Sequence, residues 1–402
     1  MRLPLLPAVL LFVLFSAGSP HAQTIPPVGT PDAFDVATWN IEHFGSPTAG
    51  PANVELQFRN VLAVIRQAEI DLWALQELNH QPTFLALLDS LGSGWDGVWQ
   101  RDETVSGFTG YGYVWRTDRA TVVQVTTILR DHNFDFAFRP PLLIRANLSH
   151  EGGARSGIRI VNIHAKCCGS LTDWERRWRA SDALKIYTDN FVSANLPILI
   201  MGDLNDRFRI SNSQGRPSPY RNFLMDEEGY HVGSLSLEDA GTPTYCSNNT
   251  CTSGSTIDHI VVSRPLIENY VENSTQRYDA LISHIPNYRS TTSDHVAVHA
   301  SFSFATDVSS EPLPEDDALV LTAYPNPMRS SGNVEFTLEQ ASAVRLSVYD
   351  VLGREMQVLV QNTLSAGTYA AEVDASALPT GVYFLRLQAD NRSLTRRISV
   401  VR

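Results

Sequence analysis

The order of hydrophobic and polar positions between residues 35 and 304 predicts a succession of strands and helices. Segments in which apolar residues alternate with polar ones, or form short unbroken runs, are predicted to be strands. These segments are residues 35–44, where the strand is expected to end at Asn40, and residues 71–77, 111–116, 122–125, 142–148, 158–164, 197–201, 255–263 and 292–304. Helices are predicted at residues 56–69, 79–91 and 174–192. This succession fits a two-layer sheet core flanked by helices.

The pattern changes on both sides of this region. Residues 1–22 have a basic start, a short apolar stretch and small residues, which is typical of a secretory signal peptide cleaved between Gly18 and Gln23. No later segment is long and apolar enough to be expected to span a bilayer. Residues 305–318 are rich in Ser, Pro and acidic side chains and are predicted to be a linker. Residues 319–402 hold short alternating strands separated by turns, the pattern of a small β-sandwich.

The charge composition of the chain limits the kinds of nucleic-acid contact to be expected. The chain has 43 acidic and 31 basic residues, which argues against a general coat for nucleic acid but not against a local basic groove. Residues 207–223 contain no acidic side chain and four arginines, namely Arg207, Arg209, Arg216 and Arg221. This segment suits contact with a phosphate backbone, or else is a solvated loop. Arg176, Arg177 and Arg179 are expected on the solvent face of the third helix.

The four cysteines are Cys167, Cys168, Cys246 and Cys251. Export makes disulfides expected. A bridge between the neighbours Cys167 and Cys168 would be strained, because adjacent α-carbons lie closer than a relaxed disulfide prefers. We therefore favour two bridges that join this pair to Cys246 and Cys251. A four-cysteine zinc site is the alternative, although the spacing is not typical of one.

Polar side chains gather at the ends of the predicted strands. They are Asn40, Glu77, His164, Asp203, Asn205, Asp258, Asp294 and His295. Carboxylate and amide oxygens are the ligands that Mg²⁺ or Ca²⁺ prefers, and histidines with a carboxylate supply proton transfer. The set suits metal-assisted attack of water on a phosphate ester. Taken singly, Glu77 could instead form a salt bridge and His164 could be structural, while His259 and His299 are expected to be packing or rim residues.

The sequence resembles two known families. The motifs TWNIEHF, LQEL, NIHAK, GDLND, IDHIVVS and SDHVAV follow one another between residues 35 and 304 and resemble those of the endonuclease/exonuclease/phosphatase superfamily, which includes pancreatic deoxyribonuclease and the abasic-site endonucleases. This resemblance implies a four-layer α/β sandwich of two packed sheets. The stretches YPNP, LSVYDVLGRE and LPTGVYFLRL resemble the type IX secretion-system sorting domain of Bacteroidetes-type bacteria, which implies delivery to the cell surface or beyond by that machinery. An adhesive β-sandwich is the alternative for residues 319–402.

The first resemblance implies a metal site. Glu77 resembles the principal metal ligand with Asn40 beside it, and Asp294 resembles a second acidic residue at the metal or phosphate. Mg²⁺ is the expected ion, with Mn²⁺ or Ca²⁺ as alternatives. The candidate substrate-binding residues are Asn205, Lys166, Arg207 and Arg209.

The same resemblance implies catalytic roles. Asp203 and Asn205 resemble the pair that orients or activates water and holds the phosphate. His295 resembles the catalytic histidine, Asp258 the carboxylate that orients it, and His164 the second histidine of the deoxyribonuclease branch. That branch has a glutamate partner for the second histidine where this sequence has Thr109 or Gly110, so the roles of the two histidines need not match it.

Together these observations predict an exported, divalent-cation-dependent phosphodiesterase and favour an endonuclease acting on DNA or RNA. A phosphatase or a sphingomyelinase-type phosphodiesterase is the alternative within the same superfamily, because the site chemistry is shared. An inactive cell-surface binding or adhesion protein is the alternative from another class. The presence of every expected acid and histidine counts against it.

Overall fold

The computed structural model describes residues 24–100, 110–304, 320–324, 328–338, 340–350, 353–390 and 392–402. The predicted signal peptide, the predicted linker and Thr109 lie outside these residues, as does most of the YPNP motif. None of the helices in the described part of the chain has the length and apolar character that crossing a membrane requires.

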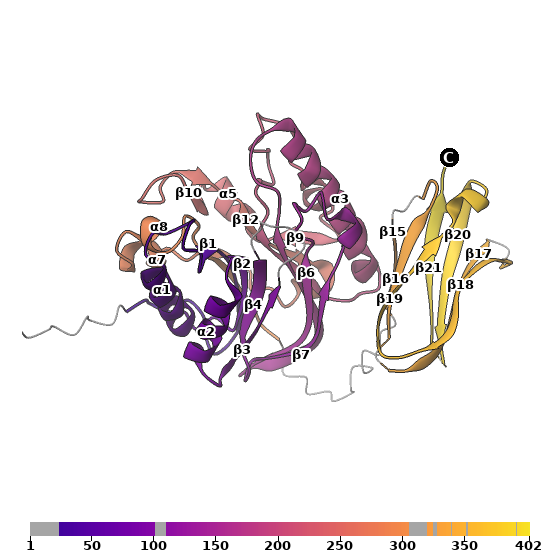
Figure 1. Ribbon diagram of the computed structural model, residues 1–402, viewed down its shortest axis with the longest axis horizontal. Helices are drawn as coiled ribbons and strands as arrows, with labels where there is room; N and C mark the ends of the chain where they lie inside the picture. Colours follow the sequence, from indigo (N-terminus) through magenta and orange to yellow (C-terminus); the bar gives the residue numbers. More distant parts are fainter. Residues whose placement is uncertain are drawn as a thin grey trace, which may run out of the picture.

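Residues 24–100 and 110–304 form two six-stranded sheets packed face to face, with helices on the outer faces (Figure 1). The strand order is β13-β14-β1-β2-β4-β3 in the first sheet and β5-β6-β7-β8-β12-β9 in the second. Both sheets are mixed, because β1 pairs in parallel with β2 and β7 with β8, while their other neighbours pair antiparallel. The predicted four-layer α/β sandwich is therefore confirmed.

The strands of this region are β1 (Phe34–Phe44), β2 (Leu72–Leu78), β3 (Trp95–Gln100), β4 (Gly110–Arg116), β5 (Ala120–Thr127), β6 (Leu142–His150), β7 (Gly153–His164), β8 (Ile198–Asp203), β9 (Tyr230–Val232), β10 (Tyr245–Cys246), β11 (Gly254–Ser255), β12 (Asp258–Ser263), β13 (Gln276–Arg277) and β14 (Val298–Phe302). The helices are α1 (Val54–Gln67), α2 (Gln81–Leu91), η1 (Arg130–His132), α3 (Leu171–Ser193), α4 (Arg221–Leu224), α5 (Leu235–Asp239), α6 (Arg264–Ile267), α7 (Ala280–His284) and α8 (Tyr288–Thr291).

Two buried polar groups fix how the sheets face each other. Between the sheets lies a core of aliphatic and aromatic side chains from both, such as Val36 and Ile260. Within it, the Tyr113 hydroxyl lies 2.9 Å and 2.8 Å from the carbonyl oxygens of Leu142 and Ile160. The Asn162 amide donates to two carbonyls of the first sheet, at 3.1 Å and 2.9 Å. Because a buried polar group left unpaired is costly, these contacts fix the alignment of β2 and β4 against β7.

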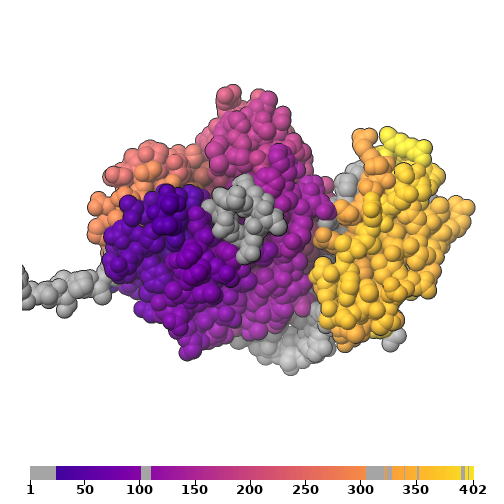
Figure 2. Space-filling view, viewed as in Figure 1, coloured from indigo at the N-terminus to yellow at the C-terminus, as the bar shows by residue number. Residues whose placement is uncertain are grey.

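The residues after 319 form a separate strand-rich unit beside α3 (Figures 1 and 2). Its sheets have the orders β15-β16-β19 and β18-β17-β20-β21 and enclose one apolar core, which confirms the predicted β-sandwich. Its elements are β15 (Val320–Tyr324), β16 (Gly332–Leu338), β17 (Ser342–Asp350), β18 (Glu355–Leu364), β19 (Gly367–Val373), η2 (Ala375–Ala377), β20 (Gly381–Ala389) and β21 (Arg392–Val400). Polar contacts to the first region include Asn333 to Asp131 at 2.6 Å and Arg396 to the carbonyl of Asn190 at 3.3 Å.

The arginines of α3 correct one prediction from the sequence. Arg177 is fully buried and Arg176 nearly so, whereas Arg179 is half exposed. Arg177 forms an ion pair with the buried carboxylate of Asp206, and Arg176 donates to the Phe134 carbonyl while its guanidinium lies 4.2 Å from the Phe134 ring centroid. The prediction of a shared solvent face was wrong because charged side chains can be buried when their donors are satisfied.

His259 on β12 should make the fold sensitive to acid. Its ring is fully buried between the Ser234 hydroxyl and the Asp206 carbonyl, and burial lowers its pKa from 6.5 to about 4. Between pH 4 and 6.5 the His259 ring is therefore protonated in the unfolded chain but neutral in the folded one. The contribution of the neutral ring to the free energy of unfolding is complete above pH 6.5 and is lost as the pH falls through 4. We expect the difference in unfolding free energy between the wild type and His259→Gln to shrink by about 3 kcal/mol between pH 7 and 4. Denaturant titrations at several pH values would measure it, and parallel curves for the two proteins would contradict it.

Candidate active site

The parallel strand pairs of the two sheets end at the same edge of the sandwich, where they border a cavity of about 540 Å³. Of the eight residues predicted to form the site, the cavity is lined by Glu77, His164, Asp203, Asn205, Asp294 and His295. Asn40 and Asp258 lie behind this lining and hydrogen-bond to members of it. The structure therefore brings all eight together.

The end of β1 is turned by an irregularity in its pairing with β2 after Asn40. Glu42 and His43 have left-handed backbones, with φ of 35° and 52°, and both side chains line the cavity. A bulge of this kind re-aims side chains at the end of a strand. Asn40 donates its amide to Glu77 at 3.2 Å and to Asp203 at 3.0 Å, so it links carboxylates from the two sheets.

Glu77 is placed by a second irregularity, between Gln76 and Leu78. Its φ is 61°, and strained backbones of this kind concentrate at functional sites. One carboxylate oxygen accepts from Asn40, and the other accepts from the backbone N–H of His43 at 3.0 Å. These two donors fix the carboxylate toward the cavity.

The GDLND segment places Asp203 and Asn205. Gly202 has a φ of 147°, and a side chain there would lie 2.0 Å from the Ile163 carbonyl oxygen, so only glycine allows β8 to approach β7 this closely. Asp203 then accepts from the backbone N–H of Asn205 at 2.9 Å. Asn205 adopts a left-handed conformation and donates its amide to the Ala165 carbonyl at 3.1 Å.

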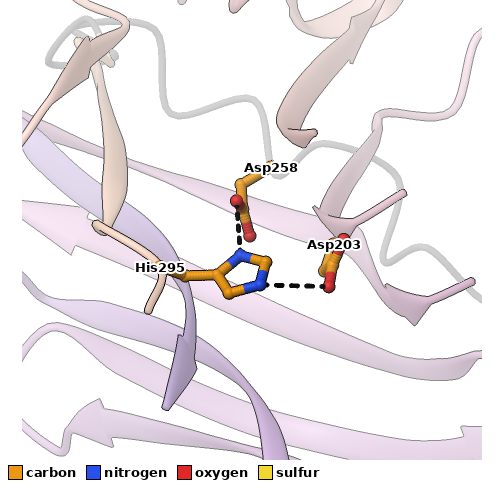
Figure 3. A group of neighbouring side chains, drawn as sticks. All are labelled: Asp203, Asp258 and His295. Carbon is orange, nitrogen blue, oxygen red and sulfur yellow. Dashed lines mark hydrogen bonds and ion pairs between the residues drawn. The ribbon is translucent and has the colours of Figure 1, made fainter. Parts of the chain in front are cut away.

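His295 lies between two carboxylates (Figure 3). Its Nδ1 is 2.8 Å from Asp258, while Nε2 is 3.9 Å from Asp203 and 3.9 Å from Asp294. Burial alone would lower the pKa of His295, but Asp258, Asp203 and Asp294 together raise it well above its ordinary value. Burial in turn raises the pKa of Asp203 to about 7, with His295 opposing the shift and Asp258 adding to it. The result is a positively charged ring beside a carboxyl group that titrates near neutrality.

The His164 ring is neutral, in contrast to the charged ring of His295. The Arg139 guanidinium lies 3.1 Å from His164 Nδ1, and because arginine only donates, this nitrogen accepts. Nε2 therefore carries the proton and faces Asp203 at 3.6 Å and Glu77 at 3.8 Å. Burial and then Arg139 lower the pKa of His164 well below its ordinary value, which keeps the ring neutral. The guanidinium of Arg139 thus fixes the tautomer of His164.

The carboxylates of Glu42, Glu77 and Asp294 line one side of the cavity and fit a hard divalent cation. Burial, followed by the charge of Asp294, raises the pKa of Glu42 to about 7, and burial with Glu77 raises that of Asp294. Carboxylates crowded in this way favour a cation between them. Asp203, Asp258 and His295 are a second group that could hold a metal, with ligand atoms all within 4.8 Å of one another. We prefer Glu42, Glu77 and Asp294 as the metal ligands, because Nδ1 of His295 in the second group is already bonded to Asp258.

The basic residues predicted to bind substrate do not line the cavity. Lys166 pairs with Asp173 at 3.0 Å, and Arg209 pairs with Asp239 at 2.7 Å on the surface. Arg207 and Asn205 flank Asp206 on the same loop, but only Asn205 reaches the cavity. Their roles in binding substrate stay predictions.

The disulfide pairing differs from the prediction. Cys246 bonds to Cys251, with α-carbons 4.6 Å apart, and Cys167 and Cys168 are free. The sequence separation of 5 residues suffices because β10 and β11 form a hairpin that brings the two thiols together. This hairpin contributes Tyr245 to the cavity lining, and the Tyr245 ring packs edge-on against His295 with centroids 5.3 Å apart.

Three functional candidates were missed from the sequence. Glu42 stands two positions after Asn40, so the same-side spacing of a strand could have indicated it. Tyr245 and Arg139 carry no comparable signal. Both stand on segments that only the folded chain brings to the site.

Sequence models of two known families match parts of this chain. The sequence model of the Endonuclease/Exonuclease/phosphatase family matches residues 37–295, and the chain belongs to that family. Its members are hydrolases that act on phosphate esters, and they use divalent metals. The model of the secretion system C-terminal sorting domain matches residues 322–401, which indicates export by the type IX system to the cell surface or beyond. No match was found among curated proteins.

Several solved structures are similar in fold. TDP2 from Caenorhabditis elegans is 15% identical, with 68% of this chain and 75% of that chain covered at a TM-score of 0.45. The endonuclease/exonuclease/phosphatase from Beutenbergia cavernae is 17% identical, with 91% and 100% covered and a TM-score of 0.48. The APE2 catalytic domain from Xenopus laevis is 15% identical, with 70% and 98% covered and a TM-score of 0.47.

Proposed function

We propose that this protein is an exported, divalent-cation-dependent phosphodiesterase whose substrates are nucleic acids. The observation that carries the proposal is the group in Figure 3, in which Asp258 holds a charged His295 beside Asp203 at the cavity wall. The raised pKa of Asp203, about 7, suits a general base working near neutral pH. The neighbouring carboxylates supply the hard oxygen ligands that a divalent cation prefers.

Water is the nucleophile in this proposal, and Asp203 accepts its proton. Asp203 and Nε2 of His295 lie 3.9 Å apart, so both can reach the same oxygen, and Asn205 stands on the same loop to orient it. The new bond forms between the water oxygen and phosphorus as the bond to the leaving oxygen breaks on the opposite side, and the leaving oxygen takes up a proton from solvent. Asp258 keeps the His295 ring charged and oriented throughout.

His164 binds the phosphoryl group rather than transferring a proton. Its neutral ring presents an N–H at Nε2, and Arg139 fixes that tautomer from the other side. A preorganised donor of this kind stabilises charge that develops on a phosphoryl oxygen. Asn40 keeps Asp203 and Glu77 in place by donating to both.

Glu77, Asp294 and Glu42 would hold the metal. A divalent cation there would neutralise the phosphate and stabilise the leaving oxygen. We expect Glu77→Gln to weaken Mn²⁺ binding by roughly tenfold or more, because a neutral amide is a poorer ligand for a hard cation. Calorimetric titration measures it directly, with the exposed Glu55→Gln on α1 as the matched control. Equal affinities in the two variants would remove Glu77 from the ligand set.

Activity should be independent of the C-terminal unit. Among the residues that the structure describes, those that line the cavity all precede residue 296, and the polar contacts from Asn333 and Arg396 reach η1 and α3 rather than the cavity. We expect a chain that ends at Ala318 to fold and to keep full turnover, while its delivery outside the cell fails. Turnover of the purified short and full-length proteins tests this, and loss of activity on truncation would show a shared site.

The experiment that tests the function is a substrate panel with the purified protein. Plasmid DNA, RNA, sphingomyelin, a phosphate monoester and a simple phosphodiester are each incubated with Mg²⁺, Mn²⁺ or Ca²⁺, and with a chelator. Cleavage of DNA or RNA that the chelator abolishes is the expected result. Cleavage of sphingomyelin or the monoester alone would overturn the nuclease assignment, and inactivity on every ester would overturn the phosphodiesterase.

A further inference from the structure

Two neighbouring thiols lie at the wall of the cavity. Cys167 and Cys168 follow β7 in the loop that leads to α3, and both line the cavity together with His164 and Asp203. Cys168 is exposed and Cys167 is half-buried. Cys246 and Cys251 already form a disulfide, so Cys167 and Cys168 are the two cysteines that can still react as thiols.

The thiols are in contact with each other. Burial raises the pKa of the Cys168 thiol, and its hydrogen bond with the Cys167 side chain raises it further. Cys168 also has a left-handed backbone with a φ of 81°, so the chain turns sharply at this residue. The ammonium group of Lys166 lies 3.5 Å from the sulfur of Cys167. The raised pKa lowers the fraction of Cys168 thiolate at neutral pH, so this thiol pair, although open to solvent, is expected to react faster with a thiophilic reagent as the pH rises.

The loop that carries the thiols also hydrogen-bonds to Asn205 and Arg139 of the site. The Ala165 carbonyl accepts from the Asn205 side chain at 3.1 Å and from Arg139 at 3.0 Å. Arg177 donates to the carbonyls of Lys166 and Cys168, each at 2.8 Å. A change in backbone conformation at Cys167 and Cys168 would therefore be transmitted to Asn205 and, through Arg139, to His164.

We propose that Cys167 and Cys168 are a reversible dithiol–disulfide pair, and that closing the bridge between them displaces the loop at residues 165–168 and lowers activity. The formation of the bridge is inferred from the contact between the two thiols and their exposure, whereas the loss of activity rests on the proposed function. The pair is thus a redox-sensitive site built into the wall of the cavity.

The strain of such a bridge makes it a switch rather than a structural bond. Consecutive α-carbons are about 3.8 Å apart, below the range of about 4.4–6.8 Å found for relaxed disulfides. A strained, exposed disulfide is reduced more easily than a relaxed one. The Cys246–Cys251 bridge, at 4.6 Å, lies within that range and is expected to resist the same reductant.

The chemistry requires a disulfide as the oxidant. The exposed Cys168 thiolate attacks a small-molecule or protein disulfide RS–SR, a mixed disulfide forms, and RS⁻ leaves and takes up a proton. The Cys167 thiolate then attacks the Cys168 sulfur, and a second RS⁻ leaves. Two thiols and RS–SR thus become one intramolecular disulfide and two molecules of RSH.

Oxidised and reduced glutathione provide the test. The full-length protein is equilibrated with each, and the peptide that contains both thiols is analysed by mass spectrometry. Hydrogen exchange of the peptides around Ala165 and Asn205, together with turnover of a simple phosphodiester, completes the comparison. The expected result is a peptide that loses two hydrogen atoms without an adduct, altered exchange, and turnover lower on the order of 10²-fold, the scale of a misplaced catalytic group.

Cys167→Ser/Cys168→Ser is the control, and its exchange and turnover should not respond to glutathione. Retained thiols or a stable glutathione adduct on the wild type would overturn the proposal. A bridge that forms while exchange and turnover stay unchanged would overturn the coupling to the site. A bridge that alters exchange in a protein without any esterase activity would support the redox site and overturn only the proposed function.

Discussion

Replacing His295 by alanine is expected to lower turnover of a phosphodiester by roughly 10²–10³, the scale of removing one preorganised donor that stabilises charge in the transition state. The ring lies at the cavity wall with Nδ1 bonded to Asp258 and Nε2 directed toward Asp203 and Asp294. Its removal takes away a positive charge that the three carboxylates stabilise. The affinity for Mn²⁺ should change little, because the preferred metal ligands Glu77 and Glu42 remain.

Asp258→Asn tests whether the pair acts as one unit. The amide keeps the shape of the carboxylate but removes the charge that raises the pKa of His295, and it can favour the wrong tautomer. The single variant should therefore be nearly as slow as His295→Ala, and the double variant scarcely slower than either. Steady-state kinetics of the three proteins measure this. Losses that multiply in the double variant would show that Asp258 does not work through His295.

Much of this site could be predicted because it lies at strand ends. A buried apolar run fixes where β8 ends, and the polar residues that follow, Asp203 and Asn205, must leave the core together. The same argument held for Asn40, Glu77 and His164. Local periodicity also located both sheets, since each central strand is apolar enough to be recognised alone.

What the sequence could not show depends on contacts between distant segments. Arg139 lies 25 residues before His164, on a segment without a strand or helix pattern. The spacing from Asn40 could have indicated Glu42, but the bulge that turns the neighbouring His43 into the cavity as well follows from pairing with β2, which no local pattern encodes. The predicted pairing of the cysteines was wrong for a related reason. The two-residue strands of the β10–β11 hairpin are too short to be recognised, so the nearness of Cys246 to Cys251 stayed hidden.

Arg177 is the case in which sequence and structure differ most, and its removal should be the most damaging change to stability. The side chain is fully buried, and so is its partner Asp206, which lies 2.9 Å from two of its nitrogens. The remaining donors reach Ser213 and the carbonyls of Lys166 and Cys168, each at 2.8 Å. One guanidinium thus joins α3 to the loop after β7 and the loop after β8, two of the segments that border the cavity.

We expect Arg177→Met to lower the free energy of unfolding by about 3–5 kcal/mol, because it leaves a buried carboxylate without its counter-charge. Denaturant titration measures the loss, and Arg179→Met on the same helix is the matched control. Arg179 is 48% exposed and pairs with Asp135, so its removal should cost at most about 1 kcal/mol. Adding Asp206→Asn to Arg177→Met should restore part of the loss, since the uncompensated charge is then gone. Equal costs for the two single variants, or no recovery in the double variant, would mean that the buried charge is not what Arg177 stabilises.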